Sequence, residues 1–342
     1  MTSMRNATVT QLDAPRIRAA GAAQALPVDC APESGAVRGE RAGGYVEIRW
    51  HGRGGQGVVS AATILAQAAL DEGKHIQTFP EFGPERSGAP IRAYNRFSDE
   101  PITVHSQVTE PDIVVVMDPT LLRVEDVSEG AKDDAIFVVN CALAPQALAP
   151  LVCSHAGQTV YTVDASKIAL EETGKNFPDT ALVGAVAQAG RISGPQAILK
   201  YVRASLQGKV SDETLEGNLR AVRRGWCEAG RAVAATVNPR RPAEMAAGRD
   251  WQDLPIGGVV AEAGSAQRYH TGAWRTMRPI LDAAKCNDCL LCWLFCPDSA
   301  VRVEGGKMLG FDLEHCKGCG ICAEVCPPRI KAITMVAETQ EL

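Results

Sequence analysis

Strand-like and helix-like segments alternate along the chain between residues 45 and 238. Alternating or nearly apolar runs, which are typical of β-strands, occupy residues 45–50, 91–98, 112–118, 135–140 and 159–164. Apolar residues recur at the helical period in residues 58–70, 166–174, 179–190, 195–206 and 212–230. This alternation, followed by a run of helices, predicts an α/β domain with a mostly parallel sheet and helices around it.

The segments on either side of this domain lack such a period. Residues 1–44 are rich in Ala, Gly, Arg and Pro and carry charges of both signs, so we expect a disordered tail. Residues 239–271 are rich in turn-forming residues and predict a linker. The chain of 342 residues is therefore expected to contain an α/β domain at 45–238 and a second, smaller domain at 272–342.

A duplicated cysteine motif dominates the second domain. Each half reads C-x2-C-x2-C-x3-C-P, and the halves repeat 30 residues apart, which is the pattern of bacterial two-cluster ferredoxins. Three cysteines at this spacing wrap one iron–sulfur cube, and the fourth points away to ligate the other cube. The pattern predicts a small α+β ferredoxin domain with two [4Fe–4S] clusters: cluster 1 on Cys286, Cys289, Cys292 and Cys326, and cluster 2 on Cys316, Cys319, Cys322 and Cys296.

Zinc and disulfides are the alternatives for these eight cysteines. Structural zinc sites typically combine two closely spaced ligands with two distant ones, and they need neither the third cysteine nor the proline after the fourth. Disulfides are unusual in a chain of cytosolic character. The ligand pattern favours the iron–sulfur interpretation.

A glycine-rich motif, HGRGGQG at residues 51–57, lies between the first predicted strand and the first predicted helix. Glycines there let the backbone turn sharply and direct its N–H groups, with the helix N-terminus, at an anion, and Arg53 adds a candidate phosphate contact. A dinucleotide site also needs an acid at the end of the second strand, whereas Asp71 and Glu72 end the helix. An anion-binding turn and simple packing of helix on strand remain open. The candidate anion-binding residues are Gly52, Arg53, Gly54, Gly55, Gln56 and Gly57.

Charge and hydropathy narrow the function classes. The formal net charge is −5 and the isoelectric point is about 5.8, which does not indicate a general affinity for nucleic acid. No apolar run approaches the roughly 18 residues that span a bilayer, and the N-terminal segment lacks the apolar core of a secretory signal. We therefore expect a cytoplasmic protein with no membrane partner.

Three stretches together resemble a known family. They are HGRGGQG at 51–57, FPEFGPERSGAPIRA at 79–93, and GAWRTMRP at 272–279 running into the cysteine motif. In these stretches the chain resembles a fusion of the gamma and delta subunits of a 2-oxoacid:ferredoxin oxidoreductase, of the pyruvate and 2-oxoisovalerate branch. The resemblance implies a gamma-type domain followed by a delta-type ferredoxin domain.

The resemblance also implies a reaction and partners. The family oxidises a 2-oxoacid with coenzyme A to an acyl-CoA, CO2 and two electrons, and thiamine diphosphate with Mg carries the carbon chemistry. This chain contains no GDG triplet, a signature of thiamine binding, so alpha and beta partner subunits are expected to supply that cofactor and the catalytic residues. The two clusters would pass electrons to an external ferredoxin or flavodoxin, and residues 52–57 would contact coenzyme A. Pyruvate is the expected substrate, with 2-oxoisovalerate or an aryl 2-oxoacid as alternatives.

Two functions of other classes are also considered. An NAD- or flavin-linked reductase with an attached ferredoxin domain would bind its cofactor at residues 52–57. A non-catalytic assembly module would carry clusters that cannot be reduced at low potential.

Overall fold

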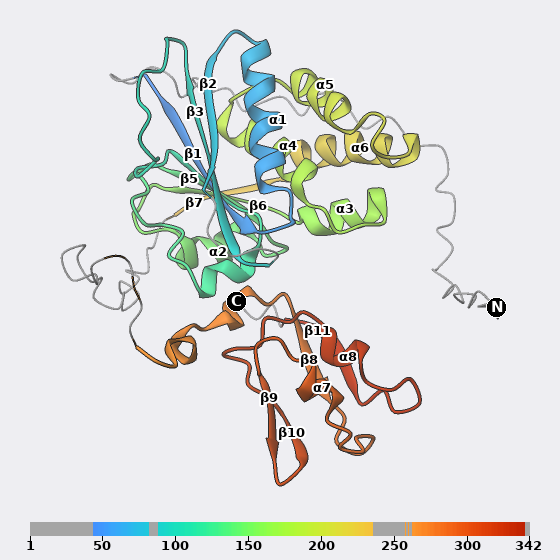
Figure 1. The fold of residues 1–342 in the computed structure, drawn as a ribbon. Coiled ribbons are helices and arrows are strands. Elements are labelled where there is room, and N and C mark those ends of the chain that lie inside the picture. The colour runs from blue at the N-terminus through green and yellow to red at the C-terminus, as the bar shows by residue number, and fades with distance from the viewer. Residues whose placement is uncertain (1–43, 82–87, 235–256, 258, 260–261, 339–342) are drawn as a thin grey trace. The chain divides into compact units, whose positions relative to one another are not determined.

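The computed structural model describes residues 44–81, 88–234, 257, 259 and 262–338 (Figure 1). The predicted tail at 1–44, apart from its last residue, lies outside the described residues. So does most of the predicted linker at 239–271. Its described end carries two short 3-10 turns, Ser265–Arg268 and Thr271–Trp274.

A seven-stranded sheet forms the centre of the α/β domain, in the order β2-β3-β1-β4-β5-β6-β7. The four strands β1, β4, β5 and β6 run parallel to one another, while β2 and β3 on one side and β7 on the other are antiparallel to their neighbours. The predicted fold class, a mostly parallel sheet with helices, is confirmed. The strands are β1 (Val46–Arg53), β2 (His75–Glu81), β3 (Pro90–Ser98), β4 (Ile113–Val116), β5 (Ile136–Asn140), β6 (Thr159–Val163) and β7 (Gly230–Val233).

Helices cover both faces of this sheet. Most of them gather on one side in Figure 1, where α4 is buried along nearly its whole length and packs against α1, α3, α5 and α6. The helix α6 begins after Ser211, whose hydroxyl accepts a hydrogen bond from the Thr214 amide at 3.2 Å. The helices are α1 (Val58–Asp71), α2 (Pro145–Val152), α3 (Ala165–Thr173), α4 (Asp179–Gly190), α5 (Pro195–Leu206) and α6 (Asp212–Glu228).

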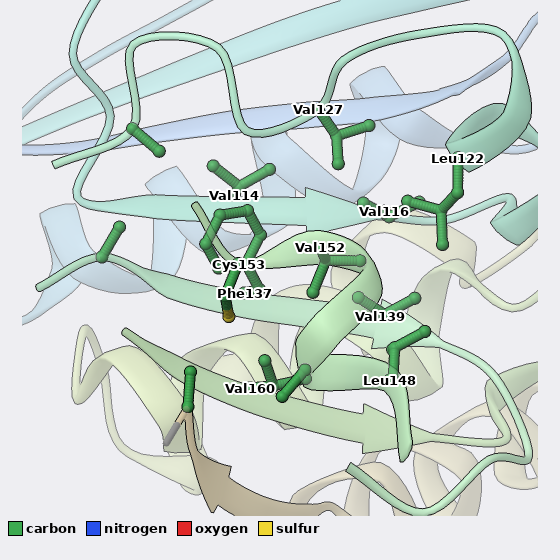
Figure 2. Packing of buried hydrophobic residues seen from close by; sticks show 14 of the residues in the cluster. Val114, Val116, Leu122, Val127, Phe137, Val139, Leu148, Val152, Cys153 and Val160 are labelled. Carbon is green, nitrogen blue, oxygen red and sulfur yellow. The ribbon is translucent and has the colours of Figure 1, made fainter. Parts of the chain in front are cut away.

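The opposite face of the sheet packs against α2. Because side chains alternate along a strand, Val114 and Val116 of β4 and Phe137 and Val139 of β5 all point to this face. They meet Leu148 of α2 in a buried apolar cluster (Figure 2).

Three details of this domain were not expected from the sequence. The helix α2 has only eight residues and contains Pro150, and β7 has only four residues, so neither gives a clear periodic pattern. The strand β1 continues through Arg53 instead of ending at Trp50. Gly52 and Arg53 pair with Ile91 and Pro90 of β3, and therefore belong to the sheet and not to the turn.

The C-terminal domain contains two small antiparallel sheets. One pairs β8 (Met277–Leu281) with β11 (Ile333–Ala337), and the other pairs β9 (Val301–Glu304) with β10 (Lys307–Phe311). Each half of the cysteine motif carries one short helix, α7 (Leu291–Leu294) or α8 (Ile321–Glu324). This is the small α+β ferredoxin-type domain expected from the sequence. Across the described ranges, the helices fall short of the length and apolar content needed to cross a bilayer.

Candidate functional site

The eight cysteines of the motif lie around two cavities. Four of them, Cys286, Cys289, Cys292 and Cys326, line the first cavity together with apolar side chains that include Leu281, Met308 and Ile333. The other four, Cys296, Cys316, Cys319 and Cys322, line the second cavity with Pro279, Phe311 and Met335. The structure thus brings together the same two sets of four that the motif assigns to cluster 1 and cluster 2.

The same local fold presents the first three cysteines of each set. The amide of Cys286 donates to the Asp282 carbonyl at 3.2 Å, and the amide of Cys316 donates to the Asp312 carbonyl at 2.9 Å. A residue with positive φ precedes each short helix, at 59° for Leu290 and 80° for Gly320. These two tight turns aim the side chains of each half inward, as the C-x2-C-x2-C spacing requires.

The fourth cysteine of each half receives a backbone hydrogen bond on its sulfur. The amide of Ala300 lies 3.3 Å from Cys296 Sγ, and the amide of Ala332 lies 3.3 Å from Cys326 Sγ. An N–H group directed at sulfur stabilises the thiolate form and raises the reduction potential of a cluster bound to it. The two halves therefore share this stabilising contact.

Burial makes several of these thiols weak acids when no metal holds them. Burial raises the pKa of Cys322 to about 12, and it also raises the pKa values of Cys292 and Cys316. Because iron binds the thiolate, loading of the site must release protons and must gain enough from the metal–sulfur bonds to offset the desolvation of the thiolates.

The spacing of the cysteines also bears on the zinc alternative. A single zinc ion requires each sulfur to lie about 2.3 Å from it, whereas a cube with iron at four corners holds its thiolates farther apart. Within the ranges that the structure describes, no group of three or more His, Cys, Asp or Glu side chains is arranged to hold one ion. Each cavity is lined by four cysteines, which is the ligand number of one [4Fe–4S] cube.

Arg53 of the glycine motif is buried and already paired. Its Nε donates to Asp118 Oδ2 at 3.1 Å, and its Nη2 donates to Thr120 Oγ1 at 2.7 Å. Its Nη1 donates to the Gly88 carbonyl at 3.1 Å. The Gln56 side chain joins this network, accepting from the Arg53 amide at 2.8 Å and donating to Asp118 at 2.7 Å. Arg53 and Gln56 therefore hold the turn in shape.

The turn itself consists of residues 54–57. The Gly54 amide donates to the Ala89 carbonyl at 2.9 Å, and Gly57 adopts a left-handed conformation with φ 85° immediately before α1. Gly55 is exposed, with φ 96° and open space around it. Gly55 thus has more room for a ligand beside its backbone than Gly52 or Gly57 has.

A row of buried polar side chains on β1 was missed at the sequence level. Arg49, His51 and Arg53 alternate along the strand and lie on one face of it. His51 Nδ1 lies 2.9 Å from Glu125 Oε2, and Arg49 Nε donates to His51 Nε2 at 3.0 Å. Burial lowers the pKa of His51 and favours the neutral ring, in which Nδ1 donates its proton to Glu125 Oε2 and Nε2 accepts from Arg49. The alternation of charged residues in the strand is the only sequence signal for this row.

Two family models match different parts of the chain. The family described as pyruvate ferredoxin/flavodoxin oxidoreductase matches residues 47–227, which span most of the α/β domain. The family described as a 4Fe-4S dicluster domain matches residues 280–335, which include all eight cysteines of the motif.

Individual relatives match the chain over about half of its length. A protein of Thermotoga maritima named pyruvate synthase subunit PorC is 44% identical over 186 residues, which are 54% of this chain and 94% of that protein. A protein of Thermococcus kodakarensis is named the common gamma subunit of pyruvate/ketoisovalerate oxidoreductases. It is 43% identical over 168 residues, covering 49% of this chain and 90% of that protein.

A solved structure, that of the pyruvate oxidoreductase subunit PORC from Thermotoga maritima, is 39% identical with a TM-score of 0.49, covering 55% of this chain and 98% of that one. The family match covers more than half of the chain, and the resemblance stated from the sequence is confirmed. The chain belongs to the pyruvate ferredoxin/flavodoxin oxidoreductase family, as a gamma-type subunit that also carries a 4Fe-4S dicluster domain.

Proposed function

We propose that the chain is the gamma/delta subunit of a thiamine-diphosphate-dependent 2-oxoacid:ferredoxin oxidoreductase. The complex would convert pyruvate, coenzyme A and oxidised ferredoxin into acetyl-CoA, CO2 and reduced ferredoxin. One observation carries this proposal: a domain of the pyruvate ferredoxin/flavodoxin oxidoreductase family shares a chain with two cavities, each lined by four cysteines.

The role of this chain is to carry electrons. When bound, two [4Fe–4S] clusters supply carriers of one electron each. Cys286, Cys289, Cys292 and Cys326 hold one of them, and Cys316, Cys319, Cys322 and Cys296 hold the other. Apolar neighbours such as Met308 and Phe311 keep water away from the cavities, and the amides on Cys296 and Cys326 favour the reduced state.

Alpha and beta subunits complete the proposed complex. They supply thiamine diphosphate, Mg and the catalytic residues, since this chain has no GDG triplet. An external ferredoxin or flavodoxin takes the electrons, and the cytoplasm is the compartment that we propose.

Coenzyme A is proposed to contact this chain at the glycine motif, residues 52–57. The paired state of Arg53 means that it shapes the turn, while the exposed Gly55 offers its backbone to a phosphate group. The support is local geometry: a turn of small residues directly before the N-terminus of the 14-residue helix α1.

A branched 2-oxoacid is the second candidate substrate. The relative from Thermococcus kodakarensis is named a subunit common to pyruvate and ketoisovalerate oxidoreductases, so one gamma-type chain can be shared between two substrates. The aryl 2-oxoacid alternative has no such observation behind it. Substrate choice depends on the pocket around the reacting carbon, which we assign to the partner subunits.

The test is anaerobic co-purification of the tagged chain followed by assays of pyruvate, 2-oxoisovalerate and an aryl 2-oxoacid. Each is supplied with coenzyme A and a viologen acceptor. We expect partner subunits that contain thiamine diphosphate and viologen reduction that is fastest with pyruvate. A purified chain that is yellow with flavin or binds NAD tightly, and that shows no 2-oxoacid activity with its partners, would overturn the proposal.

A further inference from the structure

The two halves of the cysteine motif carry different residues at the position two after the first cysteine. Asp288 follows Cys286 by two residues, and Gly318 follows Cys316 by two residues. Both have positive φ, 55° for Asp288 and 72° for Gly318, so the backbone turns in the same way at both places. One half therefore carries a carboxylate where the other half carries no side chain.

The Asp288 carboxylate lies against the cluster 1 cysteines. Its Oδ1 accepts a hydrogen bond from the Met308 amide at 2.9 Å and lies 3.8 Å from Cys286 Sγ. The amide contact fixes the carboxylate in place, so its negative charge stays next to a sulfur that must be a thiolate when it holds iron.

At the matched place in the other half, the Met277 backbone and the Arg275 side chain take the space. A Cβ atom on Gly318 would lie 2.1 Å from the Met277 carbonyl oxygen and 2.6 Å from Arg275 Cγ, so only glycine leaves room for both. The guanidinium Nη1 donates to the Cys316 carbonyl at 2.9 Å and to the Leu313 carbonyl at 2.6 Å. A cation is therefore fixed beside the cluster 2 cysteines.

Glu338 orients this arginine. It pairs with Nε at 2.5 Å and with Nη2 at 3.2 Å, while Nη1 faces Cys316. The two side chains are only 10% and 15% exposed, so water screens them little. The pair thus forms a dipole with its positive end towards the cluster 2 cysteines.

Three further charged groups near the cysteines form ion pairs of their own. Asp282 pairs with Lys285 at 2.9 Å in the first half, and Asp312 lies 2.8 Å from His315 at the corresponding positions of the second half. Lys317, beside Cys316, pairs with Asp298 at 3.3 Å. Asp288 and Arg275 thus place groups of opposite charge beside Cys286 and Cys316.

We propose that Asp288 and Arg275 set the two clusters at different reduction potentials, so that cluster 2 accepts an electron before cluster 1. The inference rests on the cluster ligands of the proposed function. A cluster becomes more negative by one charge when it takes up one electron from a low-potential donor. A fixed carboxylate opposes that step at cluster 1, and a fixed guanidinium favours it at cluster 2. With both clusters bound, an electron on cluster 1 would therefore be driven towards cluster 2.

The test is a potentiometric titration of the anaerobically purified full chain, followed by electron paramagnetic resonance. We expect two one-electron steps in the native chain. Asp288→Asn keeps an oxygen for the Met308 amide but removes the charge. It should raise the midpoint potential of the lower step by about 59 mV, which corresponds to about tenfold easier reduction. Arg275→Gln should lower the midpoint potential of the upper step by a similar amount. Arg275→Lys, which keeps the positive charge, should leave that potential close to the native value.

Glu304→Gln is the matched control, because Glu304 is an exposed acid at the end of β9 and lies in the same domain. This substitution should leave the midpoint potentials of both reduction steps unchanged. The proposal is overturned if Asp288→Asn shifts the upper step, or shifts neither step more than the control does. If Arg275→Gln does not load iron, the Asp288→Asn comparison decides alone. A native chain without iron contradicts the proposed function itself, whereas a loaded chain with unmoved potentials contradicts only this inference.

Discussion

The carboxylate of Asp179 fills the space beside Gly57. A Cβ atom on Gly57 would lie 2.7 Å from Asp179 Oδ2, so the first residue of α4 lies directly against the turn that precedes α1. Asp179 is partly buried, and this burial raises its pKa to about 6. A partly buried acid beside the glycine motif makes the stability of this region depend on pH.

The sign of this dependence follows from the raised pKa. The folded protein keeps a proton on Asp179 at pH values where the unfolded chain has lost it, so stability is greatest at low pH and falls as pH rises through about 6. Between pH 5 and pH 8 the loss amounts to about 1.4 kcal/mol. Asp179→Asn should remove this loss, as measured by hydrogen exchange of the α4 amides at the two pH values.

Asp212 offers the matched control for that experiment. It is also the first residue of its helix, α6, but it is exposed. Asp212→Asn should leave the pH dependence of α4 protection unchanged. If protection in Asp179→Asn falls with pH as steeply as in the native chain, the raised pKa is not the cause.

Helices α4 and α6 approach each other backbone to backbone. A Cβ atom on Gly225 of α6 would lie 1.8 Å from the Ala181 carbonyl oxygen of α4. Alanine normally stabilises a helix relative to glycine by about 1 kcal/mol, but here it would force the helices apart. Gly225→Ala should therefore destabilise the domain, by about 3 kcal/mol, as measured by urea denaturation followed by circular dichroism.

Gly230→Ala provides the comparison for that substitution. A Cβ atom on Gly230 would make only an ordinary contact, 3.4 Å from Pro145 Cδ. We expect its urea midpoint to stay close to the native one. Equal midpoints for the Gly225→Ala and Gly230→Ala variants would contradict the close helix contact.

Introducing a negative charge at position 55 tests the proposed contact between Gly55 and coenzyme A. Gly55→Asp places a carboxylate where a phosphate group would lie and should raise KM for coenzyme A about tenfold, with kcat at saturating coenzyme A and KM for pyruvate unchanged. Gly55→Asn, which has the same size without the charge, should have a much smaller effect. The measurement uses the assembled complex with viologen as acceptor.

Gly73→Asp is the control for the Gly55 experiment. Gly73 is also exposed, has a similar φ of 89° and has open space around it. The Gly73→Asp substitution should leave KM for coenzyme A at the native value. Equal KM values in the Gly55→Asp and native complexes would rule out the contact at this turn.

The sequence predicted well those features that depend on local patterns. The apolar run around β4 and the regular period of α4 identify these elements because a buried strand and a buried helix each require their own spacing. The crossed grouping of Cys296 and Cys326 was predicted from the spacing of the motif, and these two cysteines do line opposite cavities, although the ligation itself stays a prediction.

Features that depend on contacts between distant segments were not predictable in this way. Arg53 looked like a free anion ligand, because the sequence alone does not show that Asp118 and Thr120 meet it across 65 and 67 residues. In the same way, Asp288 and Gly318 look like ordinary turn residues in the sequence, which does not show that Met277 and Arg275 fill the space beside Gly318.

Iron and acid-labile sulfide analysis of the anaerobically purified chain, combined with electron paramagnetic resonance after dithionite reduction, tests the central claim most directly. Two [4Fe–4S] clusters on eight cysteines predict about eight irons and eight sulfides per chain and signals from two reduced clusters. Stoichiometric zinc, or no more than about four irons per chain, would contradict the assignment of both cysteine sets.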